Sequence, residues 1–181
     1  YKCNGTGTLY DYSLFPGINL IFMDFNCSDI FHEPIPNKNI IEIRHYQKGR
    51  VEFELRNNKV FHMKEGELCI NALANVPAAY SFPFGYSVGL SCVIDKDSID
   101  AKTKQIFSYY NIDVLNLGQE LEIEKKWFLC RTPQRLLHIF DELYTAKGVE
   151  GKDYFRIKLL ELFYHIKQLR IEDQYEATYY S

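Results

Sequence analysis

Short apolar runs separated by turn residues fill the first half of the chain. Val51-Glu52-Phe53-Glu54-Leu55 alternates apolar and acidic residues, which is the pattern of a strand with one buried face. The same reasoning predicts further strands over residues 18–25, 40–46, 60–63, 68–70 and 86–94, with turns at 47–49, 56–59 and 65–67. Many short strands, spaced roughly ten residues apart, indicate a sandwich or a barrel.

Helical periodicity replaces this pattern in the second half. Thr132 as N-cap, Pro133 as the first helical residue and Gly148 after the last turn predict a helix over residues 133–147. A second helix is predicted over 153–169, and a weaker one over 98–110. Strands followed by helices indicate an α+β fold, with the helices gathered on one side of an antiparallel sheet.

The second helix carries a wide apolar stripe. Packing against the first helix explains part of it, and the simplest interpretation is that this packing explains all of it. We favour the alternative that the remainder forms an exposed patch, which a two-fold homodimer would bury. The predicted dimerisation residues are Phe155, Leu159, Leu162, Phe163, Ile166 and Leu169.

Composition and charge narrow the range of possible functions. The 181 residues carry a formal net charge of −3, which argues against direct contact with nucleic acid. No apolar run approaches the ~18 residues of a membrane span. The five cysteines are scattered and form no C-x-x-C pair, as expected of free thiols in the cytoplasm rather than of a zinc site. The aromatic content of 15% predicts either an aromatic-lined cavity or an aromatic-rich core.

Two motifs resemble those of the cupin barrel, a small double-sheet jelly roll. The first is Glu42, six further residues and then Gly49 before a strand, and the second is the turn Glu65-Gly66-Glu67 that leads into the short apolar strand Leu68-Cys69-Ile70. Metal-bearing cupins also carry histidines ahead of that Glu and after the second motif. Here residues 35–38 and 77–78 contain no histidine, so only Glu42 remains of the ligand shell. One carboxylate cannot hold a catalytic transition metal. We therefore expect no metal, no cofactor and no catalytic residues.

The order of these motifs, followed by two helices, resembles the N-terminal domain of the AraC family of bacterial transcription regulators. The runs that carry the resemblance are residues 16–22, 42–52, 66–68 and 154–162. The resemblance implies a cupin-like double-sheet jelly-roll barrel at 1–97 that binds a small-molecule effector, a helical dimerisation region at 98–170, and a linker at 171–181. It further implies a helix-turn-helix half that binds DNA and is absent from this chain. The first residue, Tyr1 rather than Met, fits an excised domain.

Strand alternation places Glu42, Arg44 and Tyr46 on one face and His45 on the other. If Glu42 points into the barrel as its cupin counterpart does, the Glu and Arg either form a structural ion pair or bind a polar effector. The predicted effector-binding residues are Glu42, Arg44, Tyr46, Phe22, Phe61 and Tyr86. The alternative function is a small metal-independent cupin enzyme, an isomerase or epimerase. Such enzymes use a His–Asp pair as base, and no such pair is evident in the sequence.

Overall fold

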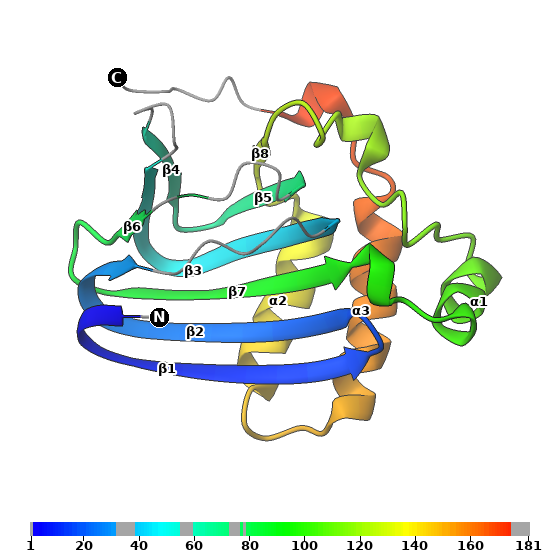
Figure 1. The fold of residues 1–181 in the computed structure, drawn as a ribbon, viewed down its shortest axis with the longest axis horizontal. Helices are drawn as coiled ribbons and strands as arrows, with labels where there is room; N and C mark the ends of the chain where they lie inside the picture. The colour runs from blue at the N-terminus through cyan, green and yellow to red at the C-terminus, as the bar shows by residue number, and fades with distance from the viewer. Residues whose placement is uncertain (1, 32–38, 55–59, 73–76, 78, 175–181) are drawn as a thin grey trace.

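The structure is a computed structural model that describes residues 2–31, 39–54, 60–72, 77 and 79–174 (Figure 1). Its strands are β1 (Lys2–Phe15), β2 (Ile18–Phe31), β3 (Ile40–Glu54), β4 (Val60–Lys64), β5 (Glu67–Ala72), β6 (Ala79–Ser81), β7 (Ser87–Asp95) and β8 (Phe128–Arg131). Its helices are α1 (Ala101–Tyr109), α2 (Gln134–Ala146) and α3 (Lys152–Ile166), with short 3₁₀ turns η2 (Lys96–Ser98), η3 (Gln119–Leu121) and η4 (Ile171–Asp173).

Two long strands that bend along their length close the barrel. One edge of β2 pairs with β1 along its whole length, and on its other edge the first part of β2 pairs with β7 and its last residues pair with β6. The first part of β3 pairs with β7 and β5, and its last part pairs with β6 and β4. Because β7 joins β2 to β3 on one side and β6 joins them on the other, the antiparallel strands form a closed ring. The expected α+β fold, a cupin-like jelly roll followed by helices, is confirmed.

The bend in β3 occurs where the sequence predicted a turn. Residues 47–49 do not end the strand. They form a bulge, with a register shift against β7 between Tyr46 and Lys48. Gly49 adopts a φ of +86°, and a Cβ there would lie 2.5 Å from the carbonyl oxygen of Tyr86. A glycine at this position therefore lets β3 pass from its pairing with β5 and β7 to its pairing with β4 and β6. The predicted turn at 56–59 lies outside the described residues.

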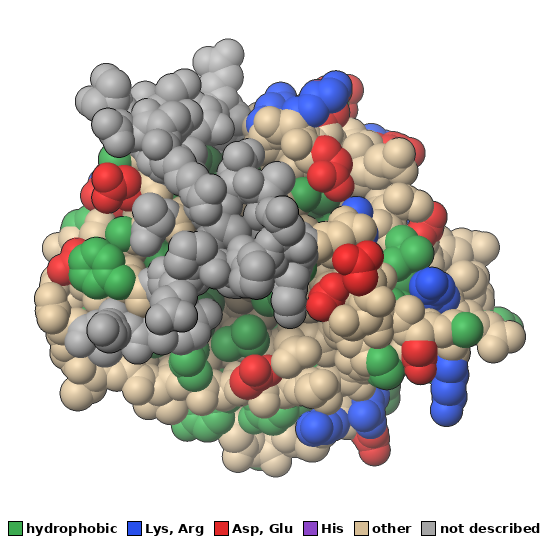
Figure 2. All heavy atoms as spheres, viewed as in Figure 1, with side chains coloured by type: hydrophobic (Ala, Val, Ile, Leu, Met, Phe, Trp, Pro, Cys, Tyr) green, Lys and Arg blue, Asp and Glu red, His purple; other side chains and the backbone are tan. Residues whose placement is uncertain are grey.

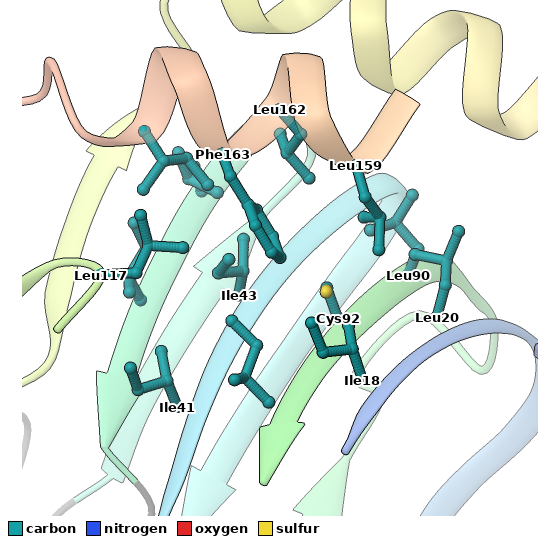
Figure 3. Close-up of a cluster of buried hydrophobic side chains, with 14 of the residues drawn as sticks. Ile18, Leu20, Ile41, Ile43, Leu90, Cys92, Leu117, Leu159, Leu162 and Phe163 are labelled. Carbon is teal, nitrogen blue, oxygen red and sulfur yellow. The ribbon is translucent and has the colours of Figure 1, made fainter. Parts of the chain in front are cut away.

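Helices α2 and α3 pack on the outer face of the barrel wall formed by β1, β2, β7, β5 and the first part of β3 (Figure 1). In Figure 3, Leu159, Leu162 and Phe163 of α3 point toward a row of hydrophobic side chains on the strands, among them Ile43, Leu90 and Cys92. A second, separate cluster of buried side chains fills the barrel interior. The sheet thus divides two cores, one between its outer face and the helices, and one inside the barrel.

His45 and Tyr144 form a polar contact within the outer core. The Tyr144 hydroxyl donates to the carbonyl oxygen of His45 at 3.0 Å and lies 3.1 Å from Nδ1 of the same residue. Because that hydroxyl already donates, it accepts from Nδ1–H, which leaves Nε2 as the unprotonated nitrogen. His45 is 2% exposed, its imidazole stacks on Phe140 at 4.2 Å, and its Nε2 has no hydrogen-bond partner in the part of the chain that the structure describes. Burial lowers the pKa of His45 to about 4, so α2 packs on a neutral imidazole.

The structure corrects the expectation for the stripe on α3. All six predicted dimerisation residues, Phe155, Leu159, Leu162, Phe163, Ile166 and Leu169, are at most 1% exposed within the single chain. From the sequence, only another helix was expected to cover these residues. In the fold the stripe also packs against the sheet, β1 and α1, as in the contact of Phe163 with Phe107. The prediction of an exposed patch on this stripe is therefore wrong.

Other differences concern element boundaries. β1, β6 and β8 were not predicted, and β8 pairs with β5 although it lies in the half read as helical. A boundary at residue 97 therefore excludes a strand of the sheet. Thr132 does not cap α2, because Pro133 occupies the N-cap position and Gln134 begins the helix. Gly148, with a φ of +74°, does follow the end of this helix as predicted. Among the described residues, no helix combines the length and apolarity needed to cross a membrane.

Candidate functional site in the barrel interior

Aromatic and aliphatic side chains line most of the barrel interior. Trp127 meets Phe53 and Phe61 edge to face, with ring centroids 5.4 and 4.9 Å apart. The buried residues of this cluster are Phe25, Cys27, Ile30, Tyr46, Val51, Phe53, Phe61, Met63, Cys69, Phe82, Trp127 and Leu129. An interior of this composition is apolar apart from the few polar groups that strand alternation turns inward.

Glu42, Arg44 and Ser91 form a polar cluster in this interior. One carboxylate oxygen of Glu42, Oε1, accepts from Arg44 Nε at 3.2 Å, from Arg44 Nη2 at 2.6 Å and from the Ser91 hydroxyl at 2.5 Å. The register explains the arrangement, because Ser91 of β7 lies opposite Arg44 of β3. The Arg44 and Glu42 side chains are only 9% and 7% exposed. Two opposite charges are therefore held together away from bulk water.

Aromatic rings flank the guanidinium. Its carbon lies 5.0 Å from the Phe53 ring centroid and 5.1 Å from that of Tyr80, distances typical of cation–π contacts. Burial acts to lower the pKa of Arg44, but the nearby Glu42, with smaller contributions from Tyr80 and Tyr46, outweighs it and raises that pKa. The site thus contains a permanently charged guanidinium. Burial raises the pKa of the adjacent Cys69 to about 12, so this thiol is not a nucleophile near neutral pH.

The structure brings four of the six predicted effector residues together. Glu42, Arg44, Tyr46 and Phe61 all lie in the interior. Phe22 lies on the opposite face of the sheet, where its ring contacts Tyr12, Tyr144 and Phe155. Tyr86 precedes β7 and is 43% exposed, beside the exposed Phe84.

Three polar residues of the interior were not predicted from the sequence: Ser91, Asn71 and Trp127. Asn71 is the informative case, because it stands within the otherwise apolar strand β5 and pairs in register with Glu42. An amide in an apolar strand opposite an inward carboxylate is a signal that register would have revealed.

The interior does not fit a cupin metal centre. No three His, Cys, Asp or Glu side chains come together as ligands in the part of the chain that the structure describes. Glu42, the one carboxylate retained from the cupin motif, holds the Arg44 cation where a metal ion would compete with it. Residues 35–38, where the first motif carries its histidines, lie outside the described residues.

Comparisons agree with the fold. No family model and no curated protein matches the chain. Among solved structures, the AraC-like transcriptional activator CuxR aligns over 94% of this chain and 59% of its own, with 9% identity and a TM-score of 0.50. ToxT from Vibrio cholerae, solved with a bound unsaturated fatty acid, aligns over 93% of this chain and 57% of its own, with 12% identity and a TM-score of 0.43. EutQ of Clostridium difficile aligns over 52% and 66%, with 15% identity and a TM-score of 0.37.

The alignment with CuxR covers the barrel and the helices together, so this combination of parts recurs in an AraC-like regulator. At 9% identity the likeness concerns the fold. This chain spans less than two thirds of the length of either regulator.

Proposed function

We propose that this chain is the effector-sensing part of a bacterial transcription regulator. A small molecule binds inside the barrel beside the Arg44–Glu42 ion pair and alters the packing of the helices on the sheet. The protein acts in the cytoplasm as a homodimer, and it contacts DNA only through a helix-turn-helix half that lies outside this sequence.

The observation that carries the proposal is the buried Glu42–Arg44–Ser91 cluster in an aromatic barrel. A buried ion pair adds little to stability, because desolvation of both charges offsets their attraction. A few convergent polar groups within an apolar interior are, in contrast, the usual composition of a small-molecule site. The cluster is therefore better explained by binding than by folding.

The barrel has a direct connection to the helices. Tyr46 faces the interior, whereas its neighbour His45 faces outward and bonds Tyr144 of α2. A ligand that displaces β3 near Arg44 therefore also moves His45, against which Tyr144 of α2 packs. No catalytic role is proposed, since neither described histidine of the barrel strands, His45 or His62, is part of the interior cluster around Glu42.

The homodimer needs a surface other than the buried stripe. The outward face of α3 presents Ile157, which is 65% exposed, and Tyr164, which is 45% exposed and lies seven residues further on. Two turns of helix separate these residues, so they lie on one side of α3. We propose this side as the dimer contact.

Direct DNA binding by this chain is not proposed, given its net charge of −3 and the interspersed acidic and basic side chains in Figure 2.

A thermal-shift screen of the 181-residue chain against a metabolite library tests the effector proposal. A ligand present at 100 times its dissociation constant stabilises by about 2.7 kcal/mol, a readily measured shift. The informative variant is Arg44→Lys, which keeps the charge but loses the planar fork that donates to Glu42.

Arg50→Lys is its matched control, because Arg50 also lies on β3 and also pairs with a glutamate two residues away, at 2.9 Å from Glu52. That pair is about 30% exposed. We expect Arg44→Lys to weaken every hit at least about tenfold and Arg50→Lys to leave the affinities unchanged. Hits that respond equally to both substitutions would place the effector elsewhere.

A further inference from the structure

We infer that the ligand of the barrel is an uncharged, hydroxyl-rich molecule of the sugar or polyol class, bound by Arg44, Asn71 and Trp127. This inference rests on the proposed function and specifies the chemistry of its effector. It follows from the register of the strands, the polar atoms that lack partners, and the charge balance of the interior.

Strand register places these groups on one inner surface. Glu42 of β3 lies opposite Asn71 of β5. Ile70 of β5 lies opposite Phe128 of β8, so Trp127, one residue before Phe128, is the cross-strand neighbour of Asn71. Glu42 of β3, Asn71 of β5 and Trp127, which immediately precedes β8, thus form a row on the inner surface. Arg44 stands in the adjacent row, opposite Cys69.

Two groups in that row lack hydrogen-bond partners among the described residues. Asn71 is 2% exposed, no described group donates to its Oδ1, and its Nδ2 has only a 4.0 Å contact with the sulfur of Cys69 within the described chain. Trp127 is 6% exposed, its ring packs in the interior, and its Nε1 has no acceptor among the residues that the structure describes. Because a buried unpaired donor or acceptor costs about 1–3 kcal/mol, native proteins rarely keep one without a ligand or a bound water.

The ion pair beside this row already has partners of its own. Arg44 Nε and Nη2 both donate to Oε1 of Glu42, Nη2 also lies 3.5 Å from the Tyr80 hydroxyl, and the guanidinium hydrogen-bonds the Tyr46 side chain. The atoms of the row that lack a partner among the described residues are therefore a donor, Nε1 of Trp127, and an acceptor, Oδ1 of Asn71. Hydroxyl groups, which donate and accept, satisfy such a mixed set.

Charge balance selects against an anion. Among the buried described residues of the interior, the full charges are those of Glu42 and Arg44, which neutralise each other. A carboxylate ligand at Arg44 would approach Glu42 as well, and burying the additional charge without its own counter-ion is costly. A neutral molecule avoids this penalty, and its C–H groups can pack on the aromatic rings of Phe53 and Trp127.

The test compares two sugars with their uronates, pairs that differ in charge and little else, and adds one further neutral polyol and one fatty acid. The 181-residue chain is titrated by calorimetry with D-glucose, D-galactose and myo-inositol, and with D-glucuronate, D-galacturonate and decanoate as the anionic set. The proposal predicts saturable binding of at least one neutral compound, and at least about tenfold weaker binding of its matched uronate.

Asn71→Leu is the diagnostic variant, since leucine keeps the branched shape of asparagine and replaces the unpaired amide with two methyl groups. Its melting temperature without ligand is expected to be equal or higher, which shows that it folds, and its affinity at least about tenfold lower. Ser87→Ala is the matched control, because Ser87 is also fully buried with an unpartnered hydroxyl but lies opposite Gly49, away from the row. Its affinity should stay unchanged. If Asn71→Leu fails to fold, Trp127→Phe provides the same comparison.

Three results would overturn the inference: tighter binding of the anionic compounds, unchanged affinity of Asn71→Leu, or no response to any neutral compound. An anionic ligand whose binding depends on Arg44 would leave the proposed function intact while refuting the ligand class. A ligand that is indifferent to Arg44 would refute the proposed function as well.

Discussion

Protonation of His45 should destabilise the contact between the barrel and α2. The folded chain holds this imidazole neutral, with Nδ1–H donating to Tyr144 and Nε2 buried without a partner. The added proton on Nε2 would find no acceptor among the described residues. The pKa is about 4 in the folded chain, against an ordinary value of 6.5 once the chain unfolds.

The difference between the two pKa values determines how stability changes with pH. Because the unfolded chain binds the proton more tightly, this contribution to stability is complete above about pH 6.5 and is lost as the pH falls toward 4. The full loss is about 3 kcal/mol, and about 2 kcal/mol of it occurs between pH 7.5 and pH 5.

Urea denaturation at pH 7.5, 6 and 5 measures this effect, and His45→Asn is the reference. The asparagine amide can replace Nδ1–H as donor to Tyr144, but it does not titrate. Other groups titrate in both proteins, so their effects cancel in the difference between the two pH profiles. We expect the native chain to lose about 2 kcal/mol more than His45→Asn between pH 7.5 and pH 5. Parallel profiles would refute the assignment of a buried neutral imidazole.

Three further predictions concern the ion pair, the bulge and the dimer. Arg44→Met should lower the free energy of unfolding by about 3–5 kcal/mol, because it leaves the Glu42 carboxylate buried without its partner. Adding Glu42→Gln should restore most of that stability. A double variant that is no more stable than the single one in urea denaturation would contradict this prediction. Gly49→Ala should lower the free energy of unfolding clearly more than Gly66→Ala does. Backbone strain at the φ of +77° costs Gly66→Ala about 1–2 kcal/mol, whereas Gly49, unlike Gly66, also lacks room for a Cβ. Equal unfolding midpoints of the two variants would argue against the bulge. Ile157→Glu should convert the dimer into a folded monomer. Sedimentation at ~100 μM measures this, because a dimer with a micromolar dissociation constant is mostly associated at that concentration. A wild-type chain that sediments as a monomer there would contradict the dimer proposal.

The inward residues of β3 were predictable because alternation along a strand is a local property. Once Glu42 was assigned to the interior, Arg44 and Tyr46 followed. Phe22 was assigned to the wrong face because β2 carries apolar residues on both of its faces, so its sequence cannot distinguish the barrel core from the core beneath the helices. A sheet covered on both sides loses the alternation that local reasoning needs.

Non-local pairing explains most of what the sequence did not reveal. The four residues of β8 become a strand because β5 offers them a partner about sixty positions earlier. β1 begins with Gly- and Thr-rich sequence, mostly exposed, and its strand is defined by pairing with β2. Asn71 and Trp127 likewise become neighbours only through the register of β5 and β8.

Trp127 allows the most direct test of whether an effector binds inside the barrel. It is the one tryptophan in the chain, and its ring lies in the interior against Phe53 and Phe61, so all tryptophan emission reports from that interior. A fluorescence titration with a compound that raises the melting temperature should give a saturable change in emission, with the same dissociation constant as calorimetry and a weaker one in Arg44→Lys. A compound that stabilises the protein saturably, leaves the emission of Trp127 unchanged and binds Arg44→Lys equally well would contradict the account.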